Sequence, residues 1–160
     1  MPLATINNLK KRVGCDLGPS EWLTITQEQV DKFAISTLDH QFIHVDVEKA
    51  SKSPFAGTIA HGFLTLSLLS HFAEKILLIP EGASVNLNYG LNKVRFLMPV
   101  LVGKRVRCFG KLLGIIEKNK DKYLTTSLMT IEIEGEKKPA LIAEWLTMAV
   151  INSGMKKNDN

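Results

Sequence analysis

The spacing of apolar positions changes about halfway along the chain. In the first half, Thr26 and Gln29 form the capping-box pattern that is typical of a helix start. Val30 and Phe33 follow, and their spacing is that of one face of a helix. This predicts a helix over 27–37. In the second half, apolar and polar residues alternate in segments separated by turn-like residues, which is typical of strands. We expect strands over 85–89, 91–96, 105–116, 123–134 and 139–151.

A long apolar segment lies between the two halves. Residues 60–78 are apolar on nearly every side of a helical projection, and Pro80-Glu81-Gly82 ends the pattern. A helix that is apolar all round is usually enclosed by the rest of its domain. Shorter elements are also expected: helices over 3–12 and from Asp46, a strand over 22–25, and loops over 14–20 and 38–45.

An enclosed helix followed by sequential antiparallel strands with short turns predicts the α+β class. We expect an antiparallel sheet wrapped around a long central helix, an arrangement whose obvious member is the hot-dog fold. The length of 160 residues suits one domain. We therefore expect a single domain over 1–160, with its core at about 20–151 and a polar tail at 152–160.

The composition, with 45% apolar and 22% charged residues, is that of an ordinary folded protein and excludes a disordered chain. The net charge of +4 favours an anionic ligand only mildly. The one dense basic cluster, Lys10-Lys11-Arg12, has no aromatic residues interleaved, so we expect no nucleic-acid partner.

The cellular location also follows from patterns in the sequence. The first residues lack the pattern of a signal peptide, and polar residues interrupt the apolar segment 63–79, so we expect no membrane span and a cytoplasmic protein. Cys15 and Cys108 show no metal-ligand spacing, nor do the four histidines, and we expect reduced thiols and no metal.

Asp39 and His44 are the most suggestive candidates for chemistry, because both lie in the expected loop after the first long helix. The helix macrodipole disfavours a negative charge at this C-terminus, and a disfavoured carboxylate is a stronger base. An imidazole five residues further on can approach the same water molecule, so the pair could activate it. From the spacing alone a purely structural role is favoured, with Asp39 in an Asx-turn and His44 bonded to the backbone.

The segment 53–62 leads into the start of the long helix. Free N–H groups at a helix N-terminus can polarise a carbonyl, and Gly62 would let a ligand approach the backbone closely or would simply permit tight packing. Ser70 lies eight residues later on nearly the same helix face. Its hydroxyl could orient Asp39 or a ligand, or bond the carbonyl one turn back. His61 is either a third titrating group or a structural residue bonded to the preceding loop.

Taken together, these segments resemble the MaoC-like dehydratase family, also called (R)-specific enoyl-CoA hydratases or hydratase 2, and in particular its NodN-like branch with a single hot-dog domain. The D-x4-H spacing of Asp39 and His44, followed by Ala60-His61-Gly62, is the most specific part. The resemblance covers about residues 20–150. The matching residues are 33–39, 44–46, Ala50, 54–64, 88–96 and 99–100.

The resemblance implies a role for each candidate. Asp39 and His44 would activate a water molecule, the backbone N–H of Gly62 would polarise a thioester carbonyl, and Ser70 would support the catalytic Asp. The implied reaction is the reversible syn addition of water to a trans-2-enoyl-CoA, which gives an (R)-3-hydroxyacyl-CoA. It needs no cofactor, since CoA belongs to the substrate, and the family's hot-dog domains imply a homodimer.

The chain departs from the family pattern at three places. Leu38 stands where the family usually has glycine, Gln41-Phe42 replaces Asn-Pro, and Leu97 and Met98 occupy positions that are usually small or proline. None of these changes removes a catalytic group. Three alternative functions stay open: a 3-hydroxyacyl-carrier-protein dehydratase, a thioesterase, and an acyl-CoA-binding module without turnover.

Overall fold

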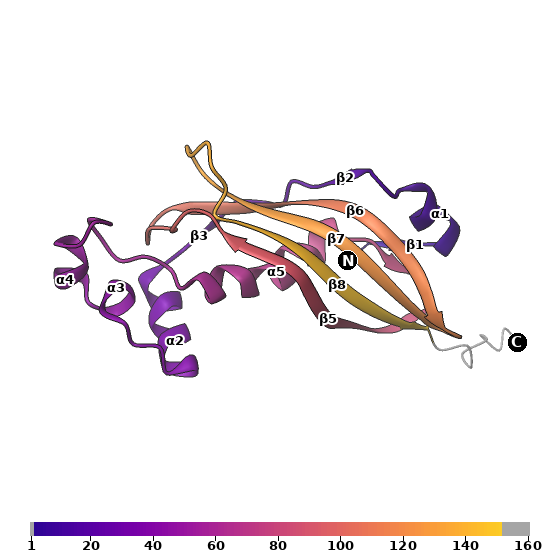
Figure 1. The fold of residues 1–160 in the computed structure, drawn as a ribbon, viewed down its shortest axis with the longest axis horizontal. Coiled ribbons are helices and arrows are strands. Elements are labelled where there is room, and N and C mark those ends of the chain that lie inside the picture. Colours follow the sequence, from indigo (N-terminus) through magenta and orange to yellow (C-terminus); the bar gives the residue numbers. More distant parts are fainter. Residues whose placement is uncertain (1, 152–160) are drawn as a thin grey trace, which may run out of the picture.

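The computed structural model describes residues 2–151, and an antiparallel sheet dominates it (Figure 1). Six strands form this sheet in the order β2-β6-β7-β8-β5, with β3 also paired to β6. Short turns join the long strands, so neighbours in the sequence are mostly neighbours in the sheet. The bounds are β2 Asp16–Leu17, β3 Leu23–Thr24, β5 Ala83–Phe96, β6 Arg105–Asn119, β7 Lys122–Ile133 and β8 Leu141–Ile151.

The long helix α5, Gly62–Ile76, packs against one face of this sheet and supplies much of the core. Leu69 and Phe72 on the helix are buried in the same apolar cluster as Met129 and Ile131 on the sheet. The α+β arrangement of a sheet curled against a long helix is therefore confirmed. The helix is not enclosed on every side within the single chain, because Phe63, Ser67, Ser70 and Glu74 leave its opposite face exposed.

The N-terminal segment covers the far end of the helix and is more varied than expected. Helix α1 spans Ile6–Lys11, because Thr5 caps it by accepting a hydrogen bond from the backbone N–H of Asn8. Strand β1, Leu3–Ala4, pairs in parallel with β4, Ile79–Pro80. The expectation of a helix over 3–12 was too long, and that of a plain loop over 14–20 was wrong, since β2 lies within it.

Three helices extend beyond one end of the sheet, and we call them the overhang: α2 Gln27–Thr37, α3 Phe42–Val45 and α4 Val47–Ser51 (Figure 1). The predicted capping box is confirmed: the Thr26 side chain accepts from the Gln29 backbone, and the Gln29 side chain accepts from the Thr26 backbone. The predicted loop over 38–45 was wrong in part, because α3 occupies its second half. The overhang places the segment 38–44 beside the start of α5.

Strand β5 forms the edge of the sheet next to β8. It is one continuous strand with register shifts around Gly90, not two strands as the sequence pattern suggested. Among residues 2–151, no helix is long and apolar enough to cross a membrane. The polar tail expected at 152–160 lies outside the described residues.

Candidate active site

Asp39, His44 and His61 meet where the overhang reaches the start of α5. One side-chain oxygen or nitrogen atom from each residue lies within 4.8 Å of the others. Asp39 follows α2, His44 belongs to α3, and His61 immediately precedes α5. The structure therefore brings together the Asp and His that the sequence singled out, and adds His61 as a third member.

His44 is held with one ring nitrogen committed and the other available. Its Nδ1 lies 2.7 Å from the backbone carbonyl of Ile59, and a carbonyl can only accept a hydrogen bond, so Nδ1 carries the proton. In the neutral ring, Nε2 then keeps its lone pair. Burial of the side chain lowers the pKa of His44, and nearby His61 also lowers it, whereas the Ile59 carbonyl and Asp39 raise it. The result favours the neutral imidazole, which can accept a proton from water.

Asp39 is exposed and lies just after a left-handed turn. Leu38 ends α2 with φ of 62°, a conformation that costs a residue other than glycine about 1–2 kcal/mol. The Asp39 carboxylate accepts a long hydrogen bond of 3.4 Å from the Gln41 backbone N–H, an Asx-type contact. Its backbone carbonyl accepts a second bond from His61 Nε2 at 3.0 Å. The carboxylate thus faces solvent while the backbone beneath it is tied to the protein.

Gly62 begins α5 at a helix end that lacks a side-chain cap, because the N-cap residue His61 makes no such bond. The first N–H groups of a helix have no intrahelical partner, so they can bind a ligand oxygen here. An added Cβ at Gly62 would lie 3.2 Å from the ring of Phe96, a close contact that glycine avoids. Both sequence-based interpretations of this glycine are therefore compatible with the structure.

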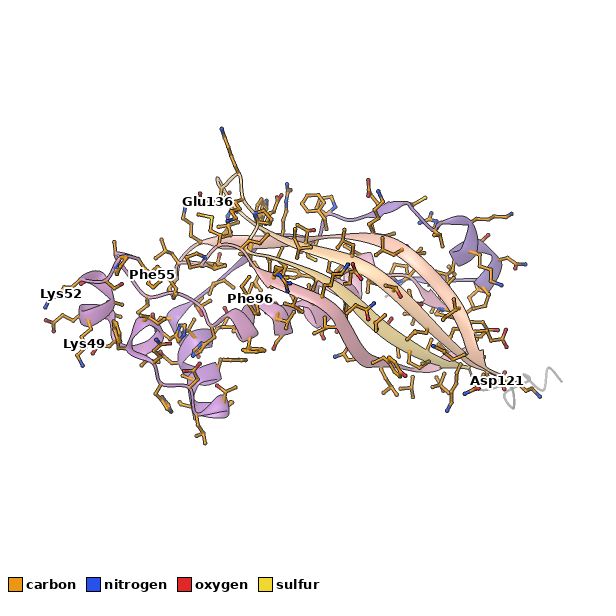
Figure 2. All side chains as sticks on the ribbon, in the orientation of Figure 1. Lys49, Lys52, Phe55, Phe96, Asp121 and Glu136 are labelled. Carbon is orange, nitrogen blue, oxygen red and sulfur yellow. The ribbon has the colours of Figure 1, made fainter. Side chains whose placement is uncertain are left out.

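A cavity of about 300 Å³ opens beside His44 and Gly62. Most of its other lining is apolar and comes from the segment before α5 and from the end of β5, including Phe55 and Phe96. Figure 2 shows these two rings at the end of the sheet nearest the overhang. Leu97 and Met98, at the positions that depart from the family pattern, line the same cavity. The cavity is suited to an apolar group that is attached to a polar reactive centre.

Ser70 lies on the exposed face of α5, more than two turns beyond Gly62. It accepts a 3.4 Å hydrogen bond from the side-chain amide of Asn88 on β5. Both residues line a second cavity of about 240 Å³ that also includes Trp145 and Leu66. The structure thus places Ser70 at the edge strand and does not show it on Asp39, and its role toward Asp39 stays a prediction.

Gln27 is a positioning residue that the sequence did not reveal. Its side-chain amide donates to the backbone carbonyl of His44 at 2.7 Å and to the carboxylate of Asp31 at 2.8 Å. Its side-chain oxygen accepts from the Thr58 hydroxyl at 2.6 Å. Gln27 therefore connects α2, α3 and the segment before α5. Only its place in the first turn of a predicted helix was visible in the sequence, and this gives no signal of such contacts.

The residues of the site do not fit a single tetrahedral metal ion. The rings of His44 and His61 stack with centroids 3.8 Å apart and an interplanar angle of 27°. Two imidazoles on one tetrahedral ion, with metal–nitrogen distances of about 2 Å, would have centroids about 5 Å apart. The observed stacking distance is therefore too short for both rings to be ligands of one such ion.

The two cysteines are free and lie away from this chemistry, as Cys15 is exposed and Cys108 is buried in the sheet. Burial raises the pKa of the Cys108 thiol to about 12. A thiol with this pKa is almost entirely protonated near neutral pH, so Cys108 is not a nucleophile.

Comparison with known proteins decides the family. Residues 8–133 match the model of the MaoC like domain. The chain belongs to the MaoC-like dehydratase family. The match spans the overhang, α5 and most of the sheet, so the candidate residues Asp39, His44, His61, Gly62 and Ser70 all lie within the family domain.

Two curated relatives of this MaoC-like protein cover nearly its full length. It is 46% identical over 140 residues to 3-hydroxyacyl-thioester dehydratase Z of Mycobacterium tuberculosis (strain ATCC 25618 / H37Rv), and the alignment covers 88% of this chain and 92% of the relative. It is also 46% identical over 145 residues to nodulation protein N of Rhizobium leguminosarum bv. viciae, with 90% of each covered. The resemblance to the NodN-like branch is therefore confirmed.

A solved structure supports the hot-dog fold of this MaoC-like domain. The R-hydratase of Pseudomonas aeruginosa in its unliganded form superposes with a TM-score of 0.67 at 22% identity, covering 88% of this chain and 83% of that chain. At this identity the likeness concerns the fold alone. The protein is thus a hot-dog domain of a dehydratase and hydratase family.

Proposed function

We propose that this protein is an (R)-specific enoyl-CoA hydratase, which adds water reversibly to a trans-2-enoyl-CoA to give an (R)-3-hydroxyacyl-CoA. The observation that carries the proposal is the meeting of Asp39 with His44, which lines a largely apolar cavity together with Gly62 at the uncapped start of α5. Hydration of an enoyl thioester needs an activated water and a donor to the thioester carbonyl. These groups supply both.

In the proposed mechanism, water lies between the Asp39 carboxylate and His44 Nε2. A proton passes from water to this pair while the oxygen forms a bond to C3 of the enoyl group, and the electron pair of the double bond moves toward the carbonyl. The N–H of Gly62 donates to the thioester oxygen as the enolate develops, an effect of about 3–4 kcal/mol in comparable oxyanion sites. C2 then takes up the proton that the pair holds, which restores Asp39 and His44 and completes the hydration without a cofactor.

The overhang itself offers little basic surface to an acidic carrier protein. Each overhang lysine has an acidic partner nearby: Lys32 pairs with Glu28, Lys49 with Asp46 and Lys52 with Glu48. An acidic carrier protein docks best on unpaired basic residues. A CoA thioester carries negative phosphate groups, which the net charge of +4 attracts mildly, and we expect it to be handled in the cytoplasm.

The edge strand β5 supports a homodimer. Its outer side chains include exposed apolar residues, among them Val85, Leu87, Tyr89 and Leu91. A long edge strand with exposed apolar side chains invites pairing with a second strand. We propose that two chains pair along β5, which would cover the exposed face of α5 and the cavity of Ser70. Sedimentation velocity at micromolar protein should then give the mass of two chains.

The direct test is loss of the enoyl-thioester absorbance of crotonyl-CoA, with product chirality read by an (R)-specific dehydrogenase. Asp39→Asn keeps the side-chain shape but removes the base, so hydration should fall by at least about 10³-fold. Asp16→Asn is the matched control, because Asp16 is an exposed carboxylate on β2, and it should leave the rate unchanged. Ser70→Ala should lower the rate less than Asp39→Asn does.

Each alternative function has its own outcome in this assay. Release of free CoA thiol without hydration would indicate a thioesterase, and binding of crotonyl-CoA without turnover would indicate a binding module. Turnover of a carrier-protein thioester but not of a CoA thioester would indicate a carrier-protein dehydratase. Near-normal hydration by Asp39→Asn would remove Asp39 from the mechanism.

A further inference from the structure

His61 occupies a helix-capping position without acting as a cap. Residues at this position are usually Ser, Thr, Asp or Asn, whose side chains accept from the first turn of the helix. The His61 ring, only 2% exposed, turns away from α5 and donates through Nε2 to the backbone carbonyl of Asp39, 22 residues earlier in the chain. The first turn of α5 is therefore left open for a ligand, and the side chain serves the Asp39 loop instead.

The Asp39 loop needs such a tie. Leu38 holds a left-handed conformation without being glycine, its side chain is 80% exposed, and the Asp39 carboxylate makes only a long 3.4 Å bond to Gln41 within the loop itself. The bond from His61 to the Asp39 carbonyl connects this loop to the well-packed start of α5.

The same ring also supports His44. The two imidazoles stack with centroids 3.8 Å apart, and the ring of Phe33 also contacts His61 in a tilted arrangement with centroids 5.0 Å apart. Because Phe33 belongs to α2 and His61 immediately precedes α5, the His44 ring rests on a ring that is itself held between two helices. His61 Nδ1 is buried without a hydrogen-bond partner among the described residues. A purely structural histidine would be expected to use both nitrogens, whereas this one uses one nitrogen and its ring face.

We propose that His61 is a positioning residue that sets the distance between the two catalytic groups, with its Nε2–H fixing the backbone of Asp39 and its ring face fixing His44. This inference rests on the proposed hydratase function. The groups that organise the site then all belong to the short segment 59–62. The Ile59 carbonyl orients His44, the His61 side chain contacts both Asp39 and His44, and Gly62 offers its N–H. Asp39 and His44 come from the overhang, and residues 59–62 place them relative to the carbonyl donor.

The test compares two substitutions that separate the donor from the ring. His61→Phe keeps a buried aromatic ring against His44 but removes the N–H, and His61→Gln keeps an amide donor but removes the ring. For His61→Phe we expect kcat for crotonyl-CoA hydration to fall about 10–100-fold while KM changes less than about 3-fold, because misplacement of a reactive group by about 1 Å has costs of this size. His61→Gln should recover part of this loss. His71→Phe, on the exposed side of α5, is the matched control and should keep the wild-type rate.

Nitrogen-15 NMR gives a readout that does not depend on the reaction. In the wild type, His61 should show the tautomer with its proton on Nε2. In His61→Phe, the backbone order parameters of residues 38–41 should fall below about 0.6, while those of α5 stay near 0.85. These results would support the positioning role even if crotonyl-CoA were not the substrate.

Four outcomes would overturn the inference. They are a wild-type kcat in folded His61→Phe, no recovery in His61→Gln, a proton on Nδ1 in the wild type, and unchanged order at 38–41. If His61→Phe failed to fold, the tautomer and the activity of His61→Gln would decide the question. Activity lost in Asp39→Asn but kept in His61→Phe would uphold the proposed function and refute the positioning role alone.

Discussion

Gln27 offers the sharpest test of how the overhang holds His44. Replacement by glutamate preserves the side-chain shape and the acceptor for the Thr58 hydroxyl, but it removes both donated hydrogen bonds. The His44 carbonyl then loses its donor, and the new carboxylate faces Asp31, whose oxygen lies 2.8 Å from the Gln27 amide nitrogen. The substitution therefore replaces two attractions with two repulsions.

The size of the effect follows from these contacts. Each lost bond costs about 1 kcal/mol, and repulsion between two partly solvated carboxylates adds about 1–2 kcal/mol after the side chains move apart. A negative charge in the first turn of α2 returns about 0.5 kcal/mol. The net loss of about 2–4 kcal/mol corresponds to a decrease of about 5–12 °C in Tm for a domain of this size. We also expect kcat to fall at least about 10-fold, because α3 carries His44.

Gln29→Glu is the matched control for Gln27→Glu. It places the same charge in the same turn of α2, yet its carboxylate can still accept from the Thr26 backbone as Gln29 does. Since both variants gain the same helix-dipole contribution, their free energies of unfolding in urea at pH 7.5 should differ by about 3–4 kcal/mol. At pH 5 the difference should shrink, because the crowded carboxyl introduced at position 27 has a raised pKa and becomes a donor again as the pH falls. Equal midpoints for the two variants at pH 7.5 would refute this account of Gln27.

Two further predictions concern the same loop. Leu38→Gly removes the left-handed strain of about 1–2 kcal/mol, and this gain exceeds the loss of about 0.4–1 kcal/mol from the greater entropy of the unfolded chain, so Tm should rise by about 1–4 °C. The control Ile35→Gly, within α2, should lower Tm. A lower Tm for Leu38→Gly would contradict the argument. Burial lowers the pKa of His44, so kcat/KM should hold its plateau down to about pH 6.5 and decline only below it. The unfolded chain takes up this proton first, so stability should also fall below about pH 6.5, and an activity decline that begins above about pH 7 would contradict the assignment.

The elements with strong local signals were predicted well from the sequence. Helix α2 begins and ends where its capping box and apolar spacing placed it, and α5 lies within the predicted 60–78. The four long antiparallel strands follow the alternating segments, although β5 was divided in two because Gly90 interrupts its pattern. These elements are defined by their own residues, so a local pattern suffices.

The parts that depend on distant contacts could not be predicted in the same way. Helix α3 has four residues and no side-chain bond at its N-cap, so it carries no periodic pattern. The proximity of Asp39 and His44 was anticipated from their spacing. The bond from His61 to the Asp39 carbonyl spans 22 residues, and that from Gln27 to the His44 carbonyl spans 17. Only the packing of the overhang onto α5 brings such partners together.

The position of the overhang also separates two kinds of stability in this molecule. The sheet and α5 share one large apolar cluster, whereas few residues of α2, α3 and α4 are buried, among them Val30, Ala34 and Ala50. Segments with few buried apolar groups open by local fluctuations at a lower free energy than global unfolding. Amide protons of the overhang should therefore exchange in a cooperative unit of their own, ahead of the sheet. On mild heating, the proposed catalytic pair should then separate and reassemble while the rest of the fold stays intact.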